Sequence, residues 1–346
     1  MTDQSLRLPA EWEPQAAVLI AWPHAGTDWA ERLTAVETTY LALAAAVTRF
    51  QPLIIVVADA SLQAHAETLL SSAGIDLVRI RFVQLPYDDT WLRDSGPITL
   101  SDHDGDAFQL ADFRFTGWGG KYGSAQDDAL VSGLVEAGLY GKEASHRRID
   151  WALEGGAIES DGKGTVLTTW RCLAQRHPEQ SRDEMSEILR DALHASRILW
   201  LDHGYLEGDD TDAHIDTLAR FAPGERIVFQ SCDDPGDPHH DELQRMGAEL
   251  AALQTRDGRA YQLHPLPWAE PILDEGRRLA ASYANYLVVN GAVLVPAYGD
   301  KADDEAARVI GSAHPGREIV QVPCRPLIWQ NGSLHCITMQ LPGRQA

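Results

Sequence analysis

The chain has 346 residues, with 29 Lys and Arg against 51 Asp and Glu, so its formal net charge is −22. Nucleic acids and anionic membrane surfaces are bound largely through cationic side chains, and this charge argues against both as partners. It suits a cationic small molecule, although an acidic surface also serves solubility alone.

No apolar run approaches the ~20 residues that a membrane-spanning helix needs, and residues 1–5 lack the basic start of a signal peptide. The four cysteines contain no C-x-x-C pair, a spacing typical neither of a disulfide framework nor of a zinc site. We therefore expect a cytoplasmic protein with reduced thiols, one of which is free to act as a nucleophile.

In the first third of the chain, short apolar runs alternate with segments whose apolar residues have helical spacing. An Asp-Gly pair at 104–105 predicts a hairpin turn. The predicted elements, in chain order, are strand 17–22, helix 29–50, strand 53–58, helix 61–73 with Ser61 as its N-cap, and strands 76–85, 98–100 and 108–115.

The same alternation continues to the end of the chain, with hairpin turns predicted at 161–162 and 290–291. Because no long linker or low-complexity tract interrupts it, we expect one α/β domain over residues 1–346. The predicted elements are helix 127–137, strands 157–160 and 165–168, helix 182–194, strands 198–201 and 227–230, helix 241–255, strands 286–289 and 292–296, helix 303–312, and strands 319–322 and 335–341.

Four chemically notable residues recur at nearly even intervals. Asp94, Glu154, His214 and Cys336 are separated by 60, 60 and 122 residues, and a hairpin with polar flanks at Asn285 lies in the longer gap. Such spacing is typical of a repeated unit of about 60–70 residues that offers one residue to a common centre. Equal gaps among selected residues also arise by chance.

Cys336 ends the segment NGSLHC, whose glycine lets backbone N–H groups approach a reacting centre. A free cysteine is equally well a small buried apolar residue. His214 and Asp216 share one face if their segment is extended, either as paired functional groups or as a solvated edge. This His-x-Asp pair lacks completing ligands, so we predict no metal site.

Asp94 lies in WLRDSGP (91–97), which predicts a loop, and Glu154 lies in LEGGA (153–157), where two glycines permit close backbone approach. Both are alternatively ordinary turn residues. Together the candidates supply one thiol, one imidazole and three carboxylates. Three carboxylates would raise the pKa of a thiol and make a poor cysteine protease, but they suit a substrate that brings its own guanidinium. That cation would favour the thiolate, which can attack the guanidinium carbon.

These motifs, with DTDAHID (210–216), NGSLHCIT (331–338), AWPH (21–24) and TGWGGKY (116–122), closely resemble the agmatine deiminase family of the guanidine-modifying (pentein) superfamily. The resemblance runs from about residue 9 to 342. It implies an α/β fold, a five-bladed propeller of ββαβ units with pseudo-fivefold symmetry, and suggests a homodimer. Two departures concern loop geometry: Ala213 stands where the family often has Gly, and Asn331-Gly332-Ser333 replaces a Gly-Gly-rich run.

The resemblance also implies roles for the matched residues and no metal or organic cofactor. Asp94 and Asp216 would clamp the guanidinium, and Cys336 would attack its carbon. His214 would protonate departing ammonia and then activate water, while Glu154 would orient His214 or a guanidinium nitrogen. With agmatine the products are N-carbamoylputrescine and ammonia.

The choice of substrate depends on what lies beside the site motifs. The segments 88–91 and 207–210 are acidic, and Asp88, Trp91 and Trp118 are candidates for contacting a cationic tail, although both tryptophans suit a core equally well. We favour agmatine, a small cationic guanidine. The alternatives are arginine or peptidylarginine deimination on the same fold, and a non-catalytic binding factor of that fold.

Overall fold

The computed structural model describes residues 6–141 and 144–343. The expectation for residues 1–5 therefore lies outside the described residues. Among the helices of the described part, none has both the length and the apolar character needed to cross a membrane.

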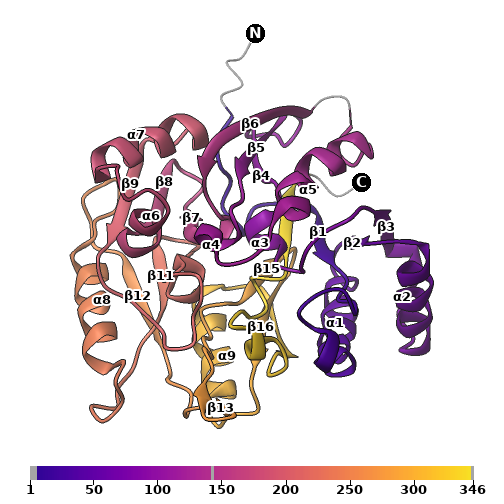
Figure 1. Ribbon diagram of the computed structural model, residues 1–346. Coiled ribbons are helices and arrows are strands. Elements are labelled where there is room, and N and C mark those ends of the chain that lie inside the picture. Colours follow the sequence, from indigo (N-terminus) through magenta and orange to yellow (C-terminus); the bar gives the residue numbers. More distant parts are fainter. Residues whose placement is uncertain (1–5, 142–143, 344–346) are drawn as a thin grey trace.

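Five sheets of the described chain share one strand pattern (Figure 1). In four of them an antiparallel pair is followed by a third strand parallel to the second. These sheets are β4 (Ile98–Ser101), β5 (Phe108–Arg114) and β6 (Ala144–Ala152); β7 (Ile158–Ser160), β8 (Thr165–Thr169) and β9 (Arg197–Leu201); β10 (Ala219–Ala222), β11 (Arg226–Gln230) and β12 (Gln262–Leu266); and β15 (Leu287–Val289), β16 (Ala292–Ala297) and β17 (Glu318–Pro323).

The fifth sheet joins the two ends of the chain. Strand β18 (Met339–Pro342) runs antiparallel to β1 (Gln15–Ala21), with Leu19 opposite Met339, and β1 continues in parallel to β2 (Leu53–Val57) and β3 (Ile80–Gln84). The repeated ββαβ unit that the family resemblance implies is thereby confirmed.

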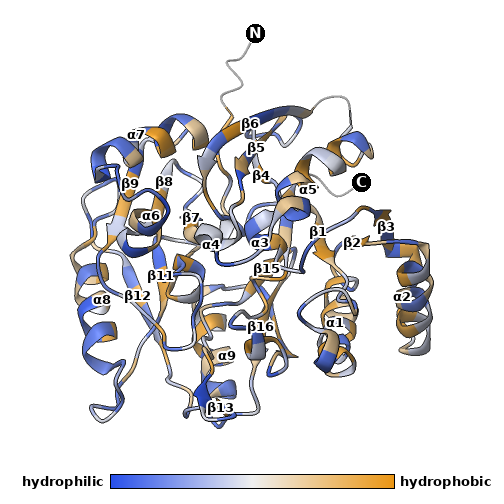
Figure 2. Ribbon diagram, in the orientation of Figure 1, coloured by the Kyte–Doolittle hydropathy of each residue, from blue (hydrophilic) through white to orange (hydrophobic). Residues whose placement is uncertain are grey.

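Helices make the crossovers that parallel strands require. They are α1 (Leu33–Val47) and α2 (Ala60–Ser72) in the fifth sheet, α5 (Ala125–Glu136), α6 (Trp170–Arg176), α7 (Arg182–Leu193), α8 (His240–Ala252) and α9 (Asp303–Ala313). Figure 2 shows both hydrophilic and hydrophobic turns on α8, whose buried residues Leu243, Met246 and Leu250 follow helical spacing. A small ribbon of β13 (Leu273–Asp274) and β14 (Arg277–Arg278) lies between β12 and β15.

Most predicted elements are present, but three local predictions are wrong. Helix α2 is capped by Asp59, which accepts the Leu62 N–H at 2.8 Å, and not by Ser61. Segment 76–85 is extended only from residue 80, because Asp76 caps a 3-10 turn over Leu77–Arg79. Segment 335–341 is extended only from Met339, and Cys336 lies in the preceding turn.

Five strands of the described chain were not predicted, for different reasons, and two of them, β13 and β14, are only two residues long. In β6 and β12 most side chains are exposed or half-buried, so neither reads as an apolar run. In β10 the charged Arg220 is buried, which a pattern of apolar residues cannot indicate.

Candidate active site

The candidate residues lie in the connections that lead into the first strand of each sheet. Asp94 is on the short helix α3 (Leu92–Ser95) before β4, and Glu154 is the residue before the 3-10 turn Gly155–Ala157 that precedes β7. His214 and Asp216 stand before β10, and Cys336 before β18. The structure brings all five into one buried cluster, because equivalent connections meet at the centre of the five sheets.

The fourth connection, before β15, contributes Asn285, which the sequence analysis noted only as a hairpin flank. Its Nδ2 lies 3.2 Å from the Cys336 Sγ, and its Oδ1 accepts the His335 N–H at 2.9 Å. Asn285 therefore holds the turn that carries the thiol. The signal that could have found it is its place in the repeat.

Cys336 faces Asp216 across 3.7 Å, measured from Sγ to Oδ2. Burial, and then the charges of Asp216 and Asp94, raise the pKa of the Cys336 thiol well above its ordinary value. The group is therefore a neutral thiol in the free protein. A cation placed between these carboxylates would favour the thiolate.

His214 is buried between two carboxylates. Its Nδ1 lies 3.5 Å from Asp94 Oδ1, and its Nε2 lies 3.6 Å from Glu154 Oε2. Burial by itself would lower the pKa of His214, but Asp94, Cys172 and Glu154 together raise it well above its usual value. The imidazole is therefore poised to carry a proton.

Segment 212–218 is not extended, so the alternation that would place His214 and Asp216 on one face does not apply. Asp212 and Ala213 have φ values of 65° and 72°, after which the chain enters a 3-10 turn over Ile215–Thr217. Ala213, which stands where the resembling family often has Gly, thus holds a left-handed conformation that favours glycine. The Asp209 Oδ2 accepts the Ala213 N–H at 2.7 Å and helps to hold this backbone.

The prediction that Asp94 lies in a loop is wrong, because the residue is on the short helix α3. It accepts the Gly156 N–H at 3.0 Å and the Trp118 Nε1–H at 2.9 Å. Burial raises the pKa of Asp94 to about 6. A Cβ at Gly156 would lie 2.7 Å from both Asp94 Oδ1 and His214 Nδ1, so only glycine allows the backbone this close.

Asp216 behaves differently from Asp94 although both are buried. Its Oδ2 lies 2.8 Å from His335 Nδ1. Burial alone would raise the pKa of Asp216, but the contact with His335 and the charges of His335, His214 and Arg220 lower it. Asp216 is thus a stable carboxylate beside the thiol, whereas Asp94 titrates nearer neutrality.

An ionic network behind Asp216 was not found from the sequence. His335 Nε2 lies 2.6 Å from Glu11 Oε1, and Glu11 pairs with both Arg220 and Arg93. Arg220 in turn donates to Glu159 at 2.8 Å. These residues are far apart in the sequence, so only the folded chain reveals the network.

A pocket of about 290 Å³ opens onto Cys336 and Asp94. Trp91 and Trp118 line it, as the sequence analysis allowed. Asp88 lines it too, but its Oδ2 accepts the Gln126 N–H at 2.7 Å and so caps α5. The remaining charged lining residues are Asp28, Asp89, Asp127, Asp210 and Arg277.

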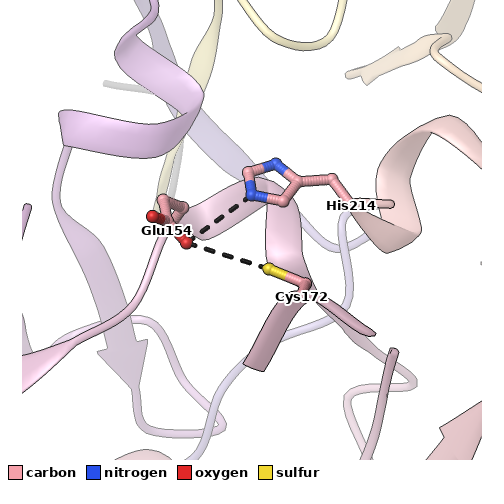
Figure 3. A group of neighbouring side chains, drawn as sticks. All are labelled: Glu154, Cys172 and His214. Carbon is pink, nitrogen blue, oxygen red and sulfur yellow. Dashed lines mark hydrogen bonds and ion pairs between the residues drawn. The ribbon is translucent and has the colours of Figure 1, made fainter. Parts of the chain in front are cut away.

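Two further side chains, those of Arg176 and Cys172, contact the Glu154 carboxylate. Arg176 Nε donates to Glu154 Oε1 at 2.7 Å, and Cys172 Sγ lies 4.0 Å from Oε2 (Figure 3). Cys172, Glu154 and His214 present donor atoms within 4.8 Å of one another, a set that could hold a metal ion. Among the candidate residues in the sequence, only the His-x-Asp pair at 214–216 has a spacing that suggests metal ligands.

Comparison with known proteins places the whole described chain in one family. Residues 7–342 match the Porphyromonas-type peptidyl-arginine deiminases. The agmatine deiminase of Stutzerimonas stutzeri (strain A1501) is 34% identical, the match covering 97% of this chain and 95% of that protein.

Two solved structures are similar over nearly their full lengths. A C. jejuni agmatine deiminase with substrate bound has 31% identity and a TM-score of 0.89, with 100% of this chain and 99% of that one covered. A Porphyromonas gingivalis protein provisionally named an arginine deiminase has 42% identity and a TM-score of 0.90, with 98% of each chain covered.

The buried network predicts that replacing Glu11 destabilises the protein much more than replacing a half-exposed glutamate. Replacing Glu11 by Ala removes the carboxylate that pairs with Arg93, and one of the two carboxylates that pair with Arg220 and with His335. It should lower the free energy of unfolding by about 3–5 kcal/mol. The control is Glu318→Ala, since Glu318 forms a half-exposed pair with Arg49 and should cost about 0–1 kcal/mol. Urea unfolding at pH 7 measures both, and equal losses would contradict the proposed importance of the network.

Proposed function

Since the chain belongs to the Porphyromonas-type peptidyl-arginine deiminase family, we propose that it hydrolyses agmatine to N-carbamoylputrescine and ammonia. The observation that carries the proposal is the buried thiol of Cys336 beside Asp216 and Asp94, with His214 and Glu154 behind them. A planar guanidinium pairs with two carboxylates at once and supplies the charge that this thiol needs.

In the proposed reaction, Asp94 and Asp216 hold the guanidinium over Cys336. As the cation binds, the thiol releases its proton to solvent, and the sulfur forms a bond to the guanidinium carbon, giving a tetrahedral adduct. His214 gives a proton to one amino group as its C–N bond breaks, and ammonia leaves. An amidino-thioether then remains on Cys336.

Water completes the cycle. Neutral His214, oriented by Glu154, accepts a proton from water while the oxygen bonds to the same carbon. The C–S bond breaks, and the ureido product loses the proton of its oxygen to solvent and departs. The thiolate then takes up a proton from solvent, which restores the free protein. None of these steps calls for a metal or an organic cofactor.

The lining of the pocket supports a substrate with a second positive charge. Asp28, Asp89 and Asp210 line it, whereas an α-carboxylate would need a cationic partner. Arg277 lines the pocket as well, but it donates to the Asn331 side chain and to the Trp329 carbonyl. Its presence makes arginine or peptidylarginine deimination the second candidate.

Three further features of the sequence analysis stay predictions: a single domain over residues 1–346, a cytoplasmic location and a homodimer.

The proposal is tested by ammonia release from agmatine, arginine and an arginyl peptide. We expect agmatine to have the highest kcat/KM, and Cys336→Ser to abolish release while binding is retained, because only the sulfur nucleophile is lost. Comparable turnover of arginine or the peptide would favour the second candidate. Undiminished ammonia release by Cys336→Ser would exclude the covalent mechanism.

The raised pKa of Asp94 predicts an acid limb in the pH profile. Asp94 must be ionised to pair with a guanidinium, and its pKa is about 6 in the free protein because it is buried. With n-butylguanidine, which has no second charge, log kcat/KM should therefore fall by one unit per pH unit below about 6. A profile that is flat down to pH 5 would show that Asp94 does not need its charge.

Asp89 should determine the preference for a second cation. Its side chain accepts the Thr90 N–H at 2.7 Å, a bond that Asn can also make, so Asp89→Asn removes mainly the charge. We expect kcat/KM for agmatine to fall about tenfold, or about 1.4 kcal/mol. Turnover of n-butylguanidine, which lacks the ammonium group, is the control and should be unchanged. An equal loss for both substrates would assign Asp89 a structural role.

A further inference from the structure

We propose that Glu154, Cys172 and His214 form a binding site for a thiophilic divalent cation such as Zn²⁺. The three donor atoms lie close to one another (Figure 3). The nitrogen involved is Nε2 of His214, whereas Nδ1 faces Asp94. The consequence for catalysis rests on the proposed function, whereas the binding itself does not.

The spacing of the donor atoms suits a small tetrahedral ion. His214 Nε2 lies 3.6 Å and Cys172 Sγ lies 4.0 Å from Glu154 Oε2, and all three atoms are within 4.8 Å of one another. Zinc bonds of about 2.0–2.3 Å at tetrahedral angles separate ligand atoms by about 3.3–3.7 Å. Small side-chain movements would close the site.

A second observation concerns the imidazole. Neither ring nitrogen of His214 makes a hydrogen bond to a described residue, although the side chain is fully buried, and its contacts with Asp94 and Glu154 are ion pairs of 3.5 and 3.6 Å. A buried nitrogen that makes no hydrogen bond is unusual, and Nε2 faces the Glu154 carboxylate at a distance that an ion could bridge. The combination of imidazole, thiol and a single carboxylate oxygen selects zinc-like ions over Mg²⁺ or Ca²⁺, which prefer oxygen ligands.

Side chains next to the three donor residues hold them in position in the absence of an ion. Thr169 caps α6 by accepting the Cys172 N–H at 3.4 Å, and its hydroxyl donates to the Ala213 carbonyl at 2.8 Å. One side chain thereby ties the segment of Cys172 to that of His214. Arg176 fixes Glu154 through Oε1, so Oε2 stays available.

The charge of the site does not oppose binding. When the ion bonds to Sγ and Nε2, the thiol and the imidazolium each release a proton to solvent. Two positive charges enter and two leave, so the net charge of the buried cluster is unchanged.

An ion at this site would inhibit without blocking the substrate. It takes the nitrogen that faces Glu154 and leaves Cys336, Asp94 and Asp216 free. Zn²⁺ should therefore lower kcat for agmatine with little change in KM. An ion held by Cys336 would instead compete with the substrate.

Binding is tested with Co²⁺, whose thiolate complexes give a charge-transfer absorption, in a Cys336→Ser background that removes the nucleophile. We expect the band in Cys336→Ser and in Cys336→Ser with Cys232→Ser, which removes another buried cysteine outside the cluster. It should be absent when Cys172→Ser or Cys172→Ala is added, with circular dichroism confirming the fold. A band that survives loss of Cys172, or no band in Cys336→Ser, would overturn the proposal.

Inhibition gives a separate test in the wild-type background. Zn²⁺ inhibition of ammonia release should weaken by at least about tenfold in Cys172→Ser and be unchanged in Cys232→Ser, each relative to its own metal-free rate. Inhibition that is competitive and unaffected by Cys172→Ser would contradict the site. If agmatine is not turned over, the proposed function fails while the cobalt measurement still decides the metal site.

Discussion

The guanidinium of Arg220, buried on β10, is the interaction that joins the β10 sheet to three of the other four sheets. It donates to Glu159 on β7 and to the carbonyls of Ala284 and Tyr286 beside β15, and it pairs with Glu11 ahead of β1. Glu11 also accepts a bond from Gln340 on β18 at 2.9 Å. A cation buried at the centre is tolerated only when several partners surround it, and these partners come from different sheets.

This central network extends directly into the candidate active site. Glu11 contacts His335, His335 contacts Asp216, and Asp216 faces the Cys336 thiol. The same contacts that join the sheets thus keep Asp216 ionised next to a neutral thiol. Burial raises the pKa of Asp94, for which His214 is the one cationic partner among the described residues. The pKa values of two carboxylates near one thiol are therefore shifted in opposite directions, because different groups surround them.

Some of the many acidic residues line the pocket, where they can interact with a cationic substrate. Asp28, Asp89, Asp127 and Asp210 line the approach to Cys336. Burial raises the pKa of both Asp89 and Asp127 to about 7, so an arriving cation would find these groups partly protonated and would favour their charged forms. Most of the 51 acidic residues lie elsewhere, and their number is still best explained by solubility.

The sequence by itself determined the repeated unit, most of the strands and helices, and the five residues of the candidate site. It could do so because hydrophobic periodicity, Asp-Gly and Asn-Gly turns and short motifs are local signals. Only the tertiary structure decided the partners of those residues: Asn285 beside Cys336, Arg220 at the centre, and Cys172 behind His214. Each joins segments distant in the chain, and the pKa of a buried group depends on which charges the fold brings within a few ångströms, a quantity that no local pattern contains.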